Sequence, residues 1–257
     1  MSKNFSENQI LELASYTGKM ILQNGGEVYR AEEVIKRVGK HFGYEVEAFV
    51  TLTCIIVSLK KNDGKYYSQV TRIKERDLNL NKIHKFNNII RHIDNFTYEE
   101  FHQKLKYIEK NFYLESHRFI LGCTIIGATF SVLFNGWINE IIIGGFGGFL
   151  IGIFLSFFSK YKINSVITNI IGGMICSFVA CFTTYLGYTE HTSIIIISDL
   201  MIFVPGIAFV NTIRDFTSGD LIAGTSRFTE VIMVATSLAV GTGIILKIFI
   251  SLGGVVY

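Results

Sequence analysis

The sequence predicts an α-helical membrane protein, built as a five-span transmembrane bundle with an N-terminal cytoplasmic α+β domain. Charge is the first observation, because 19 of the 24 lysines and arginines and 15 of the 21 acidic residues fall within residues 1–118. The second is a series of apolar segments after that point, each close to the length of about 20 residues that crosses a bilayer. We therefore place the cytoplasmic domain at residues 1–114 and the transmembrane domain at residues 115–257.

Helical periodicity organises most of the first domain. Apolar side chains recur three or four residues apart in four segments, which predicts four amphipathic helices. Their buried stripes are expected at Ile10, Leu13, Thr17 and Met20; at Ala31, Val34, Ile35, Val38 and Phe42; at Ile83, Phe86, Ile90 and Ile93; and at Phe101, Leu105, Ile108 and Phe112. Thr97 and Glu100 form a capping-box pattern, and the helix that they start is expected to lead directly into the first span.

Between the second and third helices the composition changes. Residues 44–60 and 66–73 are rich in Val, Ile, Thr and Tyr, which is typical of β-strands. The segment Lys61–Lys65 between them contains Asn-Asp-Gly, which predicts a hairpin turn. The first domain is therefore expected to be α+β.

The five spans are expected near residues 118–135, 137–158, 164–185, 193–210 and 230–250. One such segment could be a buried core helix, but five in succession favour a lipid bilayer as the surroundings. The polar N-terminus has no apolar core preceded by basic residues, so we expect no cleavable signal peptide. Two spans carry small residues at every fourth position, which allows close helix packing: Gly144, Gly148 and Gly152, and Ala235, Ala239 and Gly243. The alternative is a direct role of these glycines in gating.

The distribution of basic residues predicts the orientation. Lys160 and Lys162 follow the second span, and Arg214 and Arg227 lie between the fourth and the fifth. The loops after the first and third spans contain no lysine or arginine. By the positive-inside rule the N-terminus is cytoplasmic and the C-terminus is outside.

Motifs for enzymatic chemistry are missing from the sequence. There is no H-E-x-x-H, no G-x-S-x-G and no P-loop, and the four cysteines form no C-x-x-C pair. We expect no catalytic residues, no metal site, no cofactor and no nucleic-acid partner. Without an ATP-binding motif, any transport would draw its energy from an ion gradient or from the gradient of the substrate.

The fourth span contains the only proline of the chain. Pro205 is followed by Gly206, and Asp199 precedes both within the same apolar segment. Proline removes a backbone donor and clashes with the preceding turn, so the helix should kink or break there. Broken helices near the bilayer midplane are a recurring way to build a substrate site, and an ionisable residue in a span is costly unless it has a function.

Polar and charged residues follow the proline closely. They are Asn211, Arg214, Asp215, Asp220, Arg227 and Glu230. Asn211 and Asp215 share a helix face at i, i+4 spacing, and Arg227 and Glu230 do so at i, i+3. Together with Asp199, Pro205 and Gly206 these residues are our candidates for a substrate or ion pathway. The plainer alternative, strongest for Asp220 and Arg227, is an interfacial anchor or a solvated loop.

A second group of candidates starts the second helix of the first domain. It comprises Gly26, Glu27, Arg30 and Glu33, and it could form a cytoplasmic gate or a sensing site. The structural alternative is that acidic residues in the first turn stabilise the helix dipole.

Both groups resemble motifs of the threonine/serine exporter family. Its membrane motif is an acidic residue, then P-G, N-x-x-R-D, G-D, a turn of small residues and R-x-x-E, which this chain matches over residues 199–230. The segment L-Q-N-G-G-E-V-Y-R-A-E-E at residues 22–33 is similar to the family's front motif, and F-V-T-L-T-C-I-I-V-S-L and T-R-I-K-E-R-D-L-N-L follow it. The resemblance covers about residues 8–250.

The resemblance implies a transport function. Family members are implicated in export of threonine and serine, or of dicarboxylates such as succinate, and full-length members carry about twice the spans expected here. The chain therefore resembles the half-size, YjjP-like type, which works with a separate small multi-span membrane partner (YjjB-like) in the bacterial cytoplasmic (inner) membrane. Association with further copies of itself is left open.

The residues fit a small carboxylate-bearing substrate. Arg214 or Arg227 could pair with the carboxylate, and backbone donors after Pro205 could add to that contact. Asp199 or Asp215 could hold an ammonium group or a coupling proton. The alternative class is a membrane-anchored sensor or regulator that acts through its cytoplasmic domain, although a simple anchor needs neither five spans nor buried charges.

Overall fold

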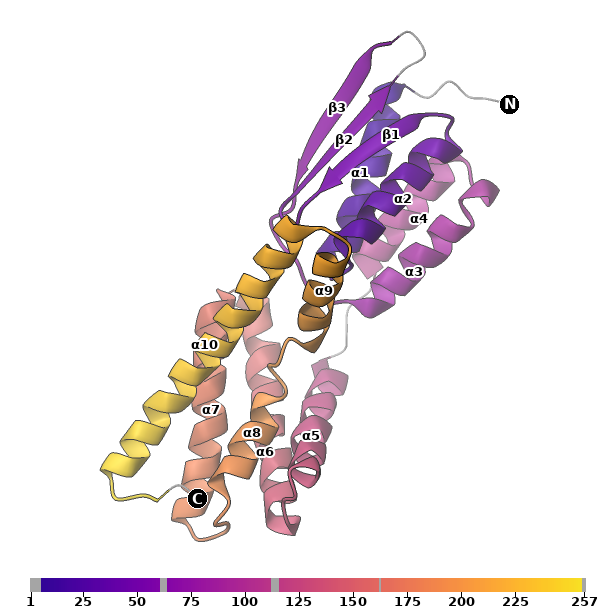
Figure 1. The fold of residues 1–257 in the computed structure, drawn as a ribbon. Helices are drawn as coiled ribbons and strands as arrows, with labels where there is room; N and C mark the ends of the chain where they lie inside the picture. Colours follow the sequence, from indigo (N-terminus) through magenta and orange to yellow (C-terminus); the bar gives the residue numbers. More distant parts are fainter. Residues whose placement is uncertain (1–5, 61–63, 112–115, 162, 256–257) are drawn as a thin grey trace. The chain divides into compact units, whose positions relative to one another are not determined.

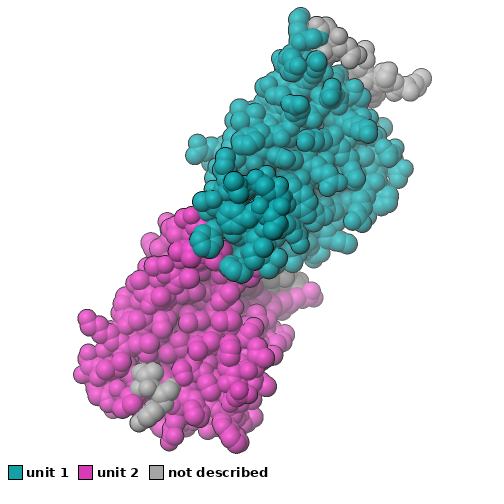
Figure 2. Space-filling view, viewed as in Figure 1, with its two compact units in different colours: residues 1–113, 207–228 teal, residues 114–206, 229–257 magenta. Residues whose placement is uncertain are grey.

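A computed structural model describes residues 6–60, 64–111, 116–161 and 163–255 of the chain. The chain divides into two compact units (Figure 2). The first comprises residues 1–113 and 207–228, and the second residues 114–206 and 229–257. Residues 207–228, which begin within the last residues of the fourth predicted span, thus group with the N-terminal part of the chain, and Ala223 belongs to its apolar core.

Helices and a small sheet make up the N-terminal part of the first unit (Figure 1). In order they are α1 (Glu7–Gln23), α2 (Val28–His41), β1 (Glu45–Val50), β2 (Cys54–Lys60), β3 (Tyr66–Arg72), α3 (Leu80–Arg91), the short 3-10 helix η1 (Ile93–Asn95) and α4 (Tyr98–Asn111). The predicted stripes lie in the core, except that Phe42 is half-buried at its edge, which confirms the four helices and their periodicity. Phe112, the last predicted stripe residue, lies outside the described residues.

The three strands form one antiparallel sheet in the order β1-β2-β3. The predicted strand region 44–60 is in fact a hairpin, because the chain reverses at Thr51–Thr53 and pairs Val50 with Ile55. The Thr51 hydroxyl accepts a hydrogen bond from the Cys54 amide at 3.1 Å, so the turn is stabilised by a side chain and needs no glycine. Of the turn predicted at residues 61–65, residues 61–63 lie outside the described part, but Lys60 pairs with Tyr66 as a hairpin requires.

The capping box before α4 is confirmed. The Thr97 amide donates to Glu100 Oε2 at 2.9 Å, and the Glu100 amide donates to the Thr97 hydroxyl at 3.4 Å. The predicted continuation of this helix into the first span involves residues 112–115, which lie outside the described residues.

The remaining helices include four that are long and apolar enough to cross a membrane. In chain order the elements are α5 (Ser116–Leu133), α6 (Ile138–Phe158), the 3-10 helix η2 (Ser159–Tyr161), α7 (Ser165–Tyr185), α8 (Thr192–Leu200), α9 (Gly206–Thr217) and α10 (Leu221–Ser251). Within the described ranges the span-length helices are α5, α6, α7 and α10. The chain is thus a helical membrane protein, and the structure gives four span-length helices where we predicted five spans.

The difference arises at the fourth predicted span, where the helix breaks as the proline predicts. Helix α8 ends at Leu200, a turn follows over residues 201–203, and α9 begins at Gly206 directly after Pro205. Phe203 in the break packs its ring against the backbone of Gly172 on α7. The apolar segment 193–210 therefore consists of parts of two short helices, neither of which has the length of a span.

Glycines determine how closely the span-length helices approach. Gly144, Gly148 and Gly152 on α6 all face the backbone of α5, so their predicted packing role is confirmed. The corresponding prediction for α10 is wrong within this chain, because Ala235 and Ala239 are exposed and Gly243 has open space beside it. On α10, Gly241 lies against Ile170 of α7, and Gly224 lies against the ring of Phe216 of α9.

Candidate functional site

Helix α9 and the start of α10 form a hairpin in the first unit, and its turn has an identifiable cause. Gly219 adopts a left-handed conformation with φ of 87°. The Asp220 amide donates to the Asp215 carbonyl and the Gly219 amide to the Phe216 carbonyl, which together make a Schellman motif. Asp220 then directly precedes α10. The turn brings Asp215 of α9 and Arg227 of α10 to facing positions.

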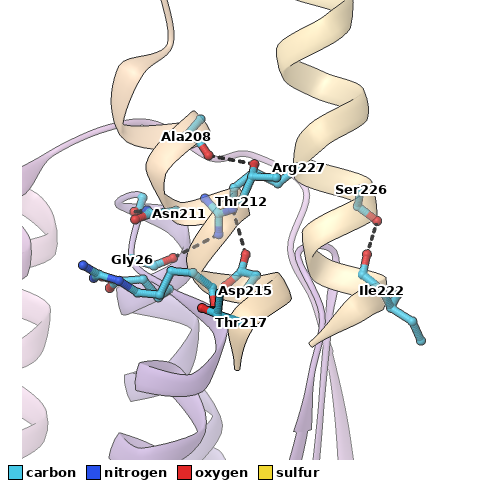
Figure 3. Close-up of polar contacts among 12 residues, drawn as sticks. Gly26, Ala208, Asn211, Thr212, Asp215, Thr217, Ile222, Ser226 and Arg227 are labelled. Carbon is cyan, nitrogen blue, oxygen red and sulfur yellow. Dashed lines mark hydrogen bonds and ion pairs between the residues drawn. The ribbon is translucent and has the colours of Figure 1, made fainter. Parts of the chain in front are cut away.

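Asp215 and Arg227 form a buried ion pair (Figure 3). Arg227 Nε donates to Asp215 Oδ2 at 3.1 Å, and the two side chains are 6% and 0% exposed. Burial raises the pKa of Asp215 above its usual value, and the adjacent Arg227 offsets part of that rise. Such a pair is costly to break, because a lone buried charge would remain.

The turn between α1 and α2 binds this hairpin through its backbone. Arg227 Nη2 donates to the Gly26 carbonyl at 3.4 Å, and the Asn211 side-chain amide donates to the Gly25 carbonyl at 3.3 Å. Gly25 has a φ of 89°, which favours glycine. At Gly26 a Cβ would lie 2.9 Å from the Ile21 carbonyl oxygen, so a side chain has no room there.

Glu27 adds a charged contact to this interface. Its carboxylate accepts a hydrogen bond from Arg214 Nη1, and Arg30 Nη1 lies 3.7 Å from its other oxygen. Glu27 stands at the N-cap position of α2 but makes no capping hydrogen bond with its side chain. We call Glu27, Asn211, Arg214, Asp215 and Arg227 the hairpin cluster. It joins candidates that the sequence assigned to two separate sites.

Three other sequence candidates are not members of the hairpin cluster. Glu33 is exposed and pairs with Arg37 at 3.7 Å on the surface of α2. Glu230 is exposed on α10, and Asp220 is half-buried at the turn. Asp220 lies within electrostatic range of Glu32, whose pKa is raised by burial; Glu32 Oε1 accepts a hydrogen bond from the Val50 amide at 3.1 Å. From the sequence we chose Glu33, whereas its neighbour Glu32 is the acid that points inward from the same helix.

A second polar position lies in the second unit. Asp199, in the last turn of α8, is 0% exposed, and neither carboxylate oxygen has a hydrogen-bond partner among the described residues. Gly127 of α5 and Gly147 of α6 face it: a Cβ on Gly127 would lie 2.8 Å from Oδ1, and one on Gly147 would overlap Oδ2. Cys176 of α7 is buried within electrostatic range. We call this the Asp199 enclosure.

The hydroxyl groups of nearby helices bond to backbone carbonyls. Ser131 donates to the Gly127 carbonyl at 2.9 Å and Ser177 to the Gly173 carbonyl at 3.0 Å. An ionised carboxylate without partners is expensive to bury, so Asp199 requires a proton, a cation or water to compensate its charge. The enclosure can therefore bind one of these chemically simple species.

The glycine at position 147 allows a direct test of the enclosure. Gly147→Ala should lower the stability of the purified protein by about 1–3 kcal/mol, because its methyl group overlaps the Asp199 carboxylate. Gly243→Ala, on a helix face with open space, is the matched control and should leave stability unchanged. Thermal unfolding in detergent measures both. Equal effects of the two substitutions would contradict the close contact between Gly147 and Asp199.

Helices α5, α6 and α7, which have the length of a span, lie around a buried carboxyl group that has no hydrogen-bond partner among the described residues. This arrangement defines a helical membrane protein with a polar site in an apolar bundle. The family model described as "Putative threonine/serine exporter" matches residues 12–249. The chain belongs to this family, which confirms the resemblance found in its motifs.

Two relatives show the same relationship. The threonine/serine exporter of Corynebacterium glutamicum is 23% identical over 250 residues, which cover 91% of this chain and 50% of that protein. The probable succinate transporter subunit YjjP of Klebsiella aerogenes is 23% identical over 237 residues, 86% of each chain. The chain thus spans about half the length of the Corynebacterium exporter. No solved structure matches the chain significantly.

Proposed function

We propose that the chain is a subunit of a secondary transporter that exports a small carboxylate-bearing solute, either an amino acid such as threonine or serine or a dicarboxylate such as succinate. The observation that carries the proposal is Asp199, a fully buried carboxyl group without a partner in the described chain, among span-length helices. An anchor has no use for such a group, whereas a transporter needs a place for an ion or a polar solute. The membrane-anchored sensor is therefore not favoured.

The substrate class draws on chemistry and on the relatives. Arg214 presents a guanidinium group that is partly open to solvent, and guanidinium groups bind carboxylates in a two-point arrangement. Arg227 is less suited, because its buried guanidinium already contacts Asp215 and Gly26. The relatives are named for threonine, serine and succinate, which all carry a carboxylate.

The proposed assembly has two components. YjjP, whose length this chain matches, is named a subunit, and the Corynebacterium exporter is twice as long as the part that matches. A separate multi-span membrane partner of the YjjB-like kind would supply the remaining spans. We place the complex in the bacterial cytoplasmic membrane with the N-terminal domain inside, as the basic loops favour.

Efflux from living cells tests this function. Cells that lack their own exporters would be loaded with a threonine-containing dipeptide or with succinate, and would express the chain alone or with its partner. We expect efflux of one of these solutes only when both proteins are present. No efflux in any combination, with both proteins verified in the membrane, would contradict the proposal.

A further inference from the structure

We infer that the Glu27 carboxylate pairs with the Arg214 guanidinium group at the position where the carboxylate of the ligand binds. The ligand and Glu27 therefore exchange at this one guanidinium group. This inference rests on the proposed function and assigns a mechanism to part of its site. It makes the turn between α1 and α2 a latch that a carboxylate-bearing solute releases.

Arg214 is the arginine of the hairpin cluster that can exchange partners. Its side chain is 48% exposed, and Nη1 contacts the Glu27 carboxylate. The Arg227 side chain is only 6% exposed and is held by Asp215 and by the Gly26 carbonyl. A solute carboxylate that approaches from solvent can therefore reach the first guanidinium group and not the second.

Arg30 stabilises the Glu27 carboxylate during the exchange. The Glu27 side chain is 9% exposed, and a buried carboxylate that loses its only counter-ion is strongly destabilised. Arg30 lies 3.7 Å from the second oxygen of Glu27 and is 36% exposed, so it keeps the carboxylate paired when Arg214 departs. Glu27 thus pairs with two arginines, and one of them, Arg214, can bind the ligand instead.

The position of Arg214 connects this exchange to the helical hairpin. Its neighbour Asp215 holds Arg227 in α10, and α10 continues from there as a span-length helix. Asn211, one turn earlier on the same helix, binds the Gly25 carbonyl. Release of Arg214 removes one of the side-chain contacts that the described residues make between α9–α10 and the α1–α2 turn, and leaves those of Asn211 and Arg227.

The latch predicts effects of opposite sign for its two ends. In Glu27→Gln the competing charge is gone, so the succinate or threonine concentration that gives half-maximal efflux should fall roughly tenfold. In Arg30→Gln, Arg214 becomes the only counter-ion of Glu27, so that concentration should rise several-fold. Arg37→Gln removes an arginine from an exposed pair of equal length on the same helix and should change nothing.

Efflux would be measured in cells that express the full chain and its partner, at graded internal concentrations of the solute. Opposite shifts for Glu27→Gln and Arg30→Gln support the latch, whereas shifts in the same direction would overturn it, because a merely structural role moves both alike. Glu27 pairs with Arg214 and Arg30 in the folded protein, so the melting temperatures of both variants would be measured beside efflux to separate a change in stability from a change in solute binding.

A second measurement does not depend on transport. Phenylglyoxal modification of Arg214 in the purified full chain would be followed by mass spectrometry at increasing succinate or threonine concentrations. We expect one of these solutes to protect Arg214, and to do so at lower concentration in Glu27→Gln than in the wild type. If neither solute protects Arg214, the latch is overturned. Protection without efflux would refute only the proposed function.

Discussion

Asp199→Asn is expected to reduce solute efflux to the background of cells that lack the chain, a loss of roughly tenfold or more. Asparagine keeps the size of the side chain, so the Asp199 enclosure should still pack. It cannot take up or release a proton and cannot neutralise a cation, which are the tasks that an unpartnered buried carboxyl group can perform. Efflux and membrane abundance would be measured together in the presence of the partner.

Glu190→Gln provides the control, because it removes an equal charge from an exposed position in the loop between α7 and α8. It should transport like the wild type. Normal efflux by Asp199→Asn at normal abundance would remove Asp199 from the pathway and would take away the main support for the proposed function.

Arg227→Ala is expected to destabilise the protein by about 3–5 kcal/mol, because it leaves Asp215 buried without its counter-ion. The double variant with Asp215→Asn should recover part of that loss, since the isolated charge is then removed as well. Unfolding of the purified full chain by heat or denaturant measures each variant and the coupling between them.

The loss in Arg227→Ala should also depend on pH. Burial raises the pKa of Asp215, and removal of the arginine removes an influence that lowers it. A carboxyl group whose pKa is raised by folding stabilises the native state at low pH and loses that contribution as the pH rises through the folded pKa. The destabilisation should therefore shrink on acidification.

Arg37→Ala is the matched control for the ion pair. Its partner Glu33 is exposed, and exposed pairs contribute about 0–1 kcal/mol. If Arg227→Ala cost no more than Arg37→Ala, the Asp215–Arg227 pair would not hold the hairpin together.

Local features of the fold were predictable because local physics produces them. The capping box at Thr97 and Glu100 and the helix break at Pro205 both depend on contacts within a few residues. The position of the turn at Thr51–Thr53 was not predicted, because a threonine hydroxyl stabilises this turn and the sequence has no glycine or proline there. The same break explains why the fourth predicted span is not one helix of span length. The mean hydropathy of an apolar segment does not depend on whether a helix ends within it.

The candidate sites show the same limit at longer range. Glu27 and Arg214 were both chosen from the sequence, yet as members of a gate and of a pathway, because residues so far apart reveal no contact in one sequence. The small-residue spacing on α6 indicated close packing but could not say that Gly147 faces Asp199. Only the arrangement of α5, α6 and α8 brings those groups together.

Solute flux in a purified system tests the central claim most directly. The chain and its multi-span partner would be reconstituted, singly and together, into liposomes that contain radiolabelled threonine or succinate, with an imposed proton or sodium gradient. The account predicts gradient-dependent release of one of these solutes from vesicles that hold both proteins, and its loss with Asp199→Asn. Absence of flux for both solutes under either gradient, with both proteins inserted and folded, would contradict the claim that this chain is a subunit of such a transporter.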